Sequence, residues 1–174
     1  MARHVCLFLA FVAMTTLGAP AQATIVSYVL SMDGAQEVPG PGDADGTAAG
    51  TITLDDATGA ISWSFTYANI ASPTAMHIHG PGGSAGSSAG VFVNLGVATS
   101  GGAGTLISST TTSTTNVASI FANPTDFYVN IHNASFPNGA VRGQLGTLVP
   151  EPASAALLGL GLIALGARRR ARNR

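Results

Sequence analysis

The sequence predicts an all-β fold, an antiparallel β-sandwich or Greek-key barrel with one short helix. Three observations support this prediction. The middle of the 174-residue chain is a series of short segments in which apolar and polar residues alternate, as they do along half-buried strands. Segments rich in glycine, proline and aspartate separate them and supply turns. Only 9% of the residues are charged, well below the usual share of about 25%, which suits a β-rich extracellular domain. We also expect an N-terminal signal helix and a C-terminal short membrane helix.

The clearest strand covers residues 60–67. Ile61, Trp63, Phe65 and Tyr67 fall on one face, and the other face carries small polar side chains. Because the aromatic face of such a strand packs inward, we expect Trp63 to be buried in the core. Further strands are expected at residues 25–32, 51–54, 91–95, 105–107, 127–132 and 140–145, and around His77 and His79.

One short helix is expected between Asn116 and Asn123. Val117, Ile120 and Phe121 have the i, i+3, i+4 spacing of one helical face. Asn116 is a candidate N-cap, and the proline after Asn123 ends the helix.

The N-terminus has the three parts of a secretory signal peptide over residues 1–23. Arg3 lies near the start, an apolar run covers residues 5–17, and Ala21 and Ala23 form an A-x-A cleavage site. An N-terminal membrane anchor is the alternative, but the run is short for a span. Export by the Sec machinery and cleavage after residue 23 would remove the only cysteine. The mature chain would then have no disulfide, thiolate nucleophile or cysteine-ligated metal.

The C-terminus combines Pro150, Glu151 and Pro152 with an uncharged stretch over residues 153–167 and a terminal arginine cluster. As a helix this stretch reaches only about 22 Å, which is short of a hydrocarbon core of about 30 Å. A permanent tail anchor is one interpretation. The three-part arrangement closely resembles the PEP-CTERM sorting signal of Gram-negative bacteria. That resemblance implies processing by an exosortase, transient membrane anchoring, a surface or extracellular location, and a link to exopolysaccharide and biofilm.

The region between Thr24 and Val149 is acidic. Its only basic residue is Arg142, against seven acidic residues, so its formal charge is 1 − 7 = −6. Such a region lacks the basic surface that phosphate backbones require, and nucleic acid is therefore excluded as a partner. As the single base in an acidic region, Arg142 is expected to pair with a carboxylate.

Three histidines lie outside the leader, in two of the expected strands. His77 and His79 share a face because the side-chain period of a strand is two residues. His132 lies with Asn130 on the polar side of its own strand. If the polar faces converge, the three imidazoles form a site that could hold copper or zinc. We therefore expect His132 within side-chain reach of His77 or His79, with Arg142 on a neighbouring strand.

A structural role for the histidines is the alternative interpretation. Histidines near strand ends hydrogen-bond neighbouring loops, and Asn130, Arg142 and Gln144 could complete a polar network between adjacent strands. The His-x-His strand and the distant arginine also resemble copper–zinc superoxide dismutase. Two histidine ligands of that family's set and its disulfide are missing here, so catalysis is not expected.

Four separated motifs resemble the CHRD domain, which was first described in chordin and also occurs in bacterial secreted proteins. They are residues 33–39 (DGAQEVP), 77–81 (HIHGP), 128–132 (YVNIH) and 137–145 (PNGAVRGQL). One departure is Ala140, where the family often has glutamate. The resemblance implies a β-rich extracellular module without an established catalytic activity.

Together these segments predict three parts: a signal peptide at 1–23, a CHRD-like β domain at 24–148 and a sorting segment at 149–174. The predicted function is that of a noncatalytic exported surface or matrix protein that needs no cofactor. The alternative is an envelope metal-binding or redox protein that uses His77, His79 and His132 to hold copper or zinc.

Overall fold

The computed structural model describes residues 23–97 and 104–146. The predicted sorting segment and all of the predicted signal peptide except its last residue, Ala23, lie outside these residues. The described residues form eight strands: β1 (Ile25–Asp33), β2 (Thr47–Asp55), β3 (Ala60–Ala68), β4 (Pro73–His79), β5 (Val91–Asn94), β6 (Thr105–Thr111), β7 (Tyr128–Asn133) and β8 (Val141–Gln144). One α-helix, α1 (Thr114–Ala122), follows β6. Two short 3-10 turns lie at Gly34–Gln36 and Pro124–Asp126.

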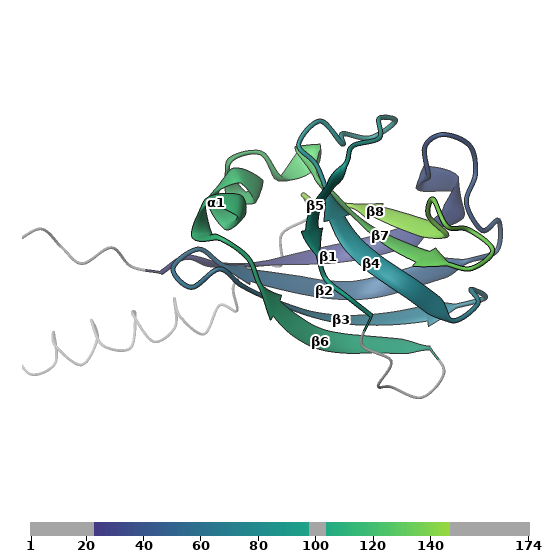
Figure 1. The fold of residues 1–174 in the computed structure, drawn as a ribbon, viewed down its shortest axis with the longest axis horizontal. Coiled ribbons are helices and arrows are strands. Elements are labelled where there is room, and N and C mark those ends of the chain that lie inside the picture. The colour runs from purple at the N-terminus through teal and green to yellow at the C-terminus, as the bar shows by residue number, and fades with distance from the viewer. Residues whose placement is uncertain (1–22, 98–103, 147–174) are drawn as a thin grey trace, which may run out of the picture.

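All eight strands belong to one antiparallel sheet in the order β5-β4-β7-β8-β1-β2-β3-β6. The sheet curls into a half-barrel whose inner face holds the core (Figure 1). The predicted all-β antiparallel fold with one short α-helix is therefore confirmed. Among the residues that the structure describes, no helix is long and apolar enough to cross a membrane.

Strand alternation determines which side chains enter the core. On β3, Ile61 and Phe65 are fully buried and Trp63 is only 3% exposed, as the pattern predicted. Helix α1 lies at one end of the half-barrel (Figure 1) and adds Val117 and Ile120 to the same core. The inner face is thus continuous from β3 to the helix.

The start of α1 differs from the prediction. Ser113, not Asn116, is the N-cap, and its hydroxyl oxygen accepts a hydrogen bond from the Asn116 backbone N–H at 3.1 Å. The cap therefore lies three residues earlier than expected, because the Ser113 hydroxyl can satisfy one of the first free N–H groups of the helix. The Asn116 side chain instead donates to the Thr112 hydroxyl.

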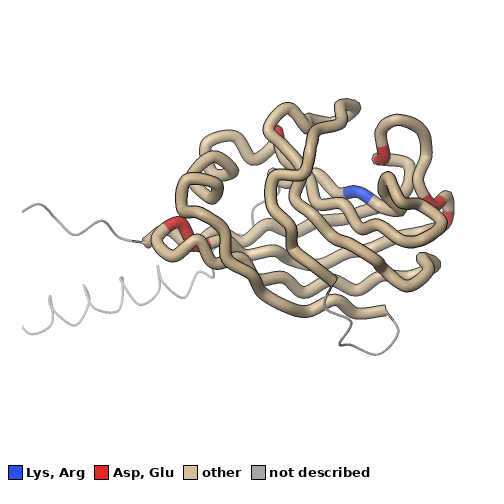
Figure 2. The backbone as a smooth tube through the Cα atoms, viewed as in Figure 1, with Lys and Arg blue, Asp and Glu red and all other residues tan. Residues whose placement is uncertain are grey.

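The outer face of the sheet has two parts. On β1, β2, β3 and β6 the outer face is largely exposed and carries serine, threonine and a few aliphatic side chains. These side chains form three cross-strand rows: Ser27–Thr53–Ser62–Ser109, Val29–Thr51–Ser64–Ile107 and Ser31–Ala49–Thr66–Thr105. We call these three rows the hydroxyl face. On β7 every residue is buried, including those whose side chains point outward. Figure 2 shows that the acidic residues gather in the loops at the ends of the strands.

Candidate metal centre

Pairing of β4 with β7 brings the three histidines together on the covered part of the outer face. His77 lies opposite Asn130 and His79 opposite Tyr128, and His132 is the next outward residue along β7. The ring centroids are 5.6 Å apart for His77 and His79, 4.9 Å for His77 and His132, and 5.8 Å for His79 and His132. One nitrogen from each ring can be chosen so that all three lie within 4.8 Å of one another.

Backbone carbonyl groups orient two of the three rings. Nδ1 of His79 lies 2.9 Å from the Ala89 carbonyl oxygen, and Nδ1 of His132 lies 3.1 Å from that of Pro137. A carbonyl oxygen only accepts, so both Nδ1 atoms carry the proton and both Nε2 atoms keep a lone pair. Nδ1 of His77, 3.1 Å from Nε2 of His132, then donates to it. Nε2 of His79 is buried without a hydrogen-bond partner among the described residues.

Burial keeps these imidazoles neutral. Desolvation is the main cause that lowers the pKa of His77, His79 and His132 below its ordinary value. The neighbouring rings lower the pKa of His77 further, because two imidazolium ions cannot sit side by side at low cost. At neutral pH the cluster therefore offers lone pairs, the form that metal ions require.

Tyr128 separates the histidines from the buried arginine. Its ring stacks on His79 from the β4 side, with centroids 4.9 Å apart and planes within 5°. From the β8 side, the Arg142 guanidinium carbon lies 3.5 Å from the centroid of the same ring. The Tyr128 hydroxyl is hydrogen-bonded at 3.3 Å to both backbone groups of Ala89, the residue that orients His79. This stack fixes the position of the His79 ring.

Among the described residues, no carboxylate accepts a hydrogen bond from Arg142, contrary to the expectation. Its guanidinium donates to the carbonyl oxygens of Gly83, Ser84 and Ser87 at 2.8, 3.1 and 2.7 Å, and to Oε1 of Gln144 at 3.0 Å. Gln144 in turn donates to the Gly83 carbonyl oxygen at 2.8 Å. Arg142 is only 1% exposed, and the loop that covers it satisfies its charge through backbone dipoles. Arg142 and Gln144 thus hold the loop at residues 80–90 over the site.

Asn130, the third residue of the predicted polar network, does not contact Arg142 by a hydrogen bond. It donates to the Glu37 carboxylate at 3.2 Å and more weakly to the Asn138 carbonyl oxygen at 3.4 Å. The prediction of one network therefore resolves into two groups: Arg142 with Gln144, and Asn130 with Glu37. Both lie on the same outer face as the histidines, because Asn130 is opposite His77 on β4 and opposite Arg142 on β8.

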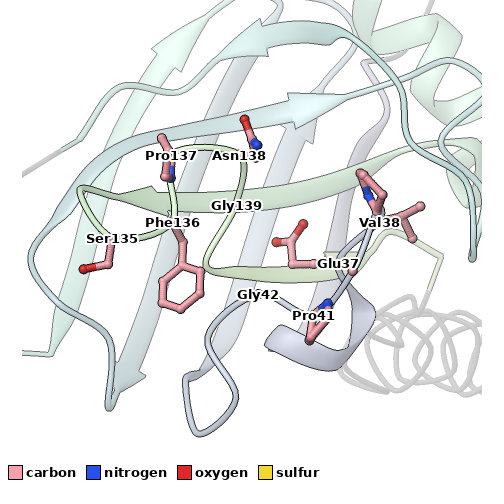
Figure 3. A pocket seen from close by; sticks show the side chains of 11 residues that line it. Glu37, Val38, Pro41, Gly42, Ser135, Phe136, Pro137, Asn138 and Gly139 are labelled. Atoms are coloured by element: carbon pink, nitrogen blue, oxygen red, sulfur yellow. The ribbon is translucent and has the colours of Figure 1, made fainter.

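Glu37 was missed as a site residue. Burial raises the pKa of its carboxyl to about 7, against the opposing effects of the Arg142 charge and the Asn130 hydrogen bond. Figure 3 shows its side chain in a hollow between residues 37–42 and the turn at 135–139. The volume of this hollow is about 190 Å³. Pro137, which orients His132, is part of the same hollow. A single acid in a loop rich in glycine and proline gave no signal beyond its place in a family motif.

This geometry sets the chemistry that the site can support. Three neutral imidazoles suit Cu²⁺ or Zn²⁺, and carbonyl groups that hold the Nδ1–H of two of them form the outer shell usual for metal-binding histidines. Both terminal nitrogens of the Arg142 guanidinium donate to oxygens of the covering loop or of Gln144, which ties this side chain to the loop. Of the predicted cleavage site, Ala23 is described and is exposed. Ala21 and the sorting motif (Pro150, Glu151 and Pro152) lie outside the described residues.

The fold and the site together define an antiparallel β domain that holds a histidine cluster under loops on its outer face. The CHRD domain model matches residues 28–145, and the chain belongs to the CHRD domain family. The PEP-CTERM protein-sorting motif matches residues 148–170 and indicates an exported envelope or surface protein that an exosortase processes. The resemblances to the CHRD domain and to the PEP-CTERM sorting signal are therefore confirmed. No curated protein and no solved structure matches the chain significantly.

Proposed function

We propose that this exported protein binds one Cu²⁺ or Zn²⁺ ion through His77, His79 and His132. The observation that carries the proposal is the pair of carbonyl-bound Nδ1–H groups on His79 and His132. They leave the Nε2 lone pair of His79 without a partner among the described residues and that of His132 in contact with Nδ1 of His77. One nitrogen per ring can be chosen so that all three lie within 4.8 Å. Bonds of about 2.0–2.1 Å to one ion would draw the nitrogens closer than this. His77, the most exposed of the three, lies where an ion would enter.

Metal titration of the exported protein tests this proposal. Calorimetry with Cu²⁺ and with Zn²⁺ should give one ion per chain, and His132→Ala should lower the affinity at least about tenfold. Ser64→Ala on the hydroxyl face is the control and should leave binding unchanged. A wild-type protein that takes up neither ion would leave the histidines with a structural role alone.

The proposed role is noncatalytic. Imidazoles oriented by fixed carbonyl groups, with Arg142 held by the covering loop, favour storage or sequestration of the ion over turnover. A superoxide dismutase-like activity is the competing proposal. It predicts that the copper-loaded protein accelerates superoxide decay and that His77→Ala abolishes the acceleration.

We further propose that the domain acts within an exopolysaccharide or biofilm matrix outside a Gram-negative cell. The hydroxyl face supports this role because it presents rows of serine and threonine without a charged side chain. Such a face can hydrogen-bond a neutral polysaccharide. Sedimentation of the protein with the matrix polysaccharide of the source cells tests it, and Ser62→Glu with Ser64→Glu should release the protein. Unchanged co-sedimentation of this double variant would show that the hydroxyl face does not bind the polysaccharide.

Export is proposed to proceed by two cleavages through a transient inner-membrane intermediate. The A-x-A site at Ala21 and Ala23 and the terminal arginine cluster support this order of events. The intact mass of the exported protein should lack residues 1–23 and the arginine tail. Recovery of the outer form with Arg174 still attached would contradict it.

A further inference from the structure

The two edge strands of the sheet differ in how they are protected. β5 has four residues, and a register irregularity interrupts its pairing with β4. β6 has seven residues and pairs with β3 in continuous register from Thr105 to Thr111. It contains no charge, proline or glycine, which are the usual devices that keep a sheet edge from pairing with another chain.

The outer edge of β6 carries a regular row of backbone groups that have no partner in residues 23–97 and 104–146. The Thr112 N–H donates to the Gly59 carbonyl oxygen at 2.9 Å, and the Tyr67 N–H donates to that of Gly104 at 2.7 Å. These bonds fix the alternation of the ladder. The residues that bond to β3 are Leu106, Ser108 and Thr110. The residues that turn N–H and C=O away from β3 are Thr105, Ile107, Ser109 and Thr111. Within the described residues, β3 is the strand partner of β6.

We propose that two copies of this chain dimerise by antiparallel pairing of their β6 strands about a twofold axis at Ser108. This register places Ile107 opposite Ser109 of the second copy, and Thr105 opposite Thr111 of the second copy. All four outward residues of each strand are then paired, with about eight N–H···O bonds between the copies. Ile107, which is 53% exposed in the single chain, approaches its symmetry mate on the outer face.

Charge favours a second copy as the partner at this edge. The region between Thr24 and Val149 carries a formal charge of −6, so two copies repel each other wherever their acidic residues meet. Figure 2 shows no acidic or basic residue along β6. A twofold interface must be complementary to itself, and an uncharged strand meets this condition.

The difference between the edges also limits the assembly to two copies. Once β6 is paired with its mate, the remaining edges of the dimer are two β5 strands. Each is short and irregularly paired, so a third copy finds no comparable edge. The hydroxyl faces of the two copies become one surface across the new junction.

Sedimentation velocity of the exported protein over a range of concentrations tests the dimer. The wild type should show a concentration-dependent equilibrium between monomer and dimer. Ser109→Pro removes an N–H that points away from β3, so all bonds between β6 and β3 are kept. The variant should fold, because proline is tolerated on an edge strand where the N–H faces solvent. It should sediment as a monomer. Ser109→Ala keeps the N–H and is the matched control, which should dimerise like the wild type.

A second variant keeps the test valid if Ser109→Pro fails to fold. Ile107→Lys places a charge at the twofold axis and should also give monomer, with an unchanged circular dichroism spectrum. In the wild type, amide exchange at Ile107 and Ser109 should slow as the protein concentration rises. A wild type that stays monomeric, a dimer that survives both Ser109→Pro and Ile107→Lys, or polymers larger than two copies would overturn the proposal.

Discussion

The outer faces of β3 and β7 follow the same two-residue period, yet β3 exposes its outward residues and β7 buries them. On β3 the outward side chains are Ser62, Ser64 and Thr66, and all are exposed. On β7 they are Tyr128, Asn130 and His132, and all are buried. The two strands have the same alternation of side chains, and the difference in exposure arises because loops cover the outer face of β7 but not that of β3. Loops that are tied to Arg142, Tyr128 and His132 close over β7.

The comparison shows what burial does to polar groups of ordinary chemistry. Hydroxyl groups on β3 exchange bonds with water and need no specific partner. Imidazole, amide and guanidinium groups under the loops lose water and must find protein partners. The few that do not, such as Nε2 of His79, are candidates for ligand binding. The same burial lowers the pKa of the histidines and raises that of Glu37.

The largest expected effect is on the inward side of β3. Trp63→Ala should destabilise the domain by about 3–5 kcal/mol, because the change leaves a large cavity in a close-packed core. Urea denaturation followed by circular dichroism measures the loss. The wild-type fluorescence maximum should be that of a buried indole. An emission maximum typical of an indole in water would show that Trp63 is outside the core.

The covered half should respond to a conservative change at its centre. Arg142→Lys keeps the charge, but one ammonium group cannot reach three carbonyl oxygens and stack on Tyr128. We expect a loss of about 2–3 kcal/mol in the free energy of unfolding. Amide exchange should also accelerate across residues 80–90, where the carbonyl partners lie. A loss below about 0.5 kcal/mol would mean that the loop is held by other contacts.

Glu37→Gln should change how stability depends on pH. Burial raises the pKa of Glu37 to about 7, so the folded protein holds this proton more tightly than the unfolded chain. The contribution of Glu37 is present below about pH 4.5 and is lost as the pH rises through about 7. After discounting for solvent screening, this loss is on the order of 1 kcal/mol.

The difference between wild type and Glu37→Gln isolates this effect from the histidines. Their lowered pKa values have the opposite sign: their contribution is present above about pH 6.5 and falls as the pH drops. Denaturation midpoints of both proteins should therefore diverge between about pH 4.5 and pH 7 and run parallel above it. Parallel curves throughout this range would place the pKa of Glu37 near its ordinary value.

The smallest effect is expected on the exposed half. Ser64→Ala lies beside Trp63 on β3 but points outward, and it should change the free energy of unfolding by less than about 0.5 kcal/mol. The melting temperature of this variant measures the difference. A loss comparable with that of Trp63→Ala would mean that the hydroxyl face is covered in the folded protein.

The sequence pattern was sufficient to predict the face on which a side chain lies wherever this depends on a single strand. The period of two placed Trp63 inside and put His77 and His79 on one side. The family motifs and the sorting motif were recognised from local spacing. The approach of His132 to His77 and His79 also depends on the pairing of β4 with β7. The sequence alone did not predict this pairing, so the three-histidine site was predicted only on the condition that the polar faces converge.

Sequence pattern failed where loops decide the environment. Nothing in the alternation of β7 distinguishes an outward face in water from one under a cover. The partners of Arg142 are backbone carbonyl groups, which every residue carries, so no residue type marked them. Glu37 looked like any solvated loop acid. The N-cap at Ser113 was missed because the choice between two capping residues three positions apart depends on where the preceding strand ends.

The backbone ties of Arg142 have a consequence for sequence variation. Its guanidinium donates hydrogen bonds to the backbone carbonyl oxygens of Gly83, Ser84 and Ser87 and not to their side chains. Side chains at Ser84 and Ser87 are therefore free to change while the loop keeps its path. The surface over Arg142, on the far side of Tyr128 from the histidines, can thus diversify from one member of the family to another without disturbing the arginine that anchors the loop.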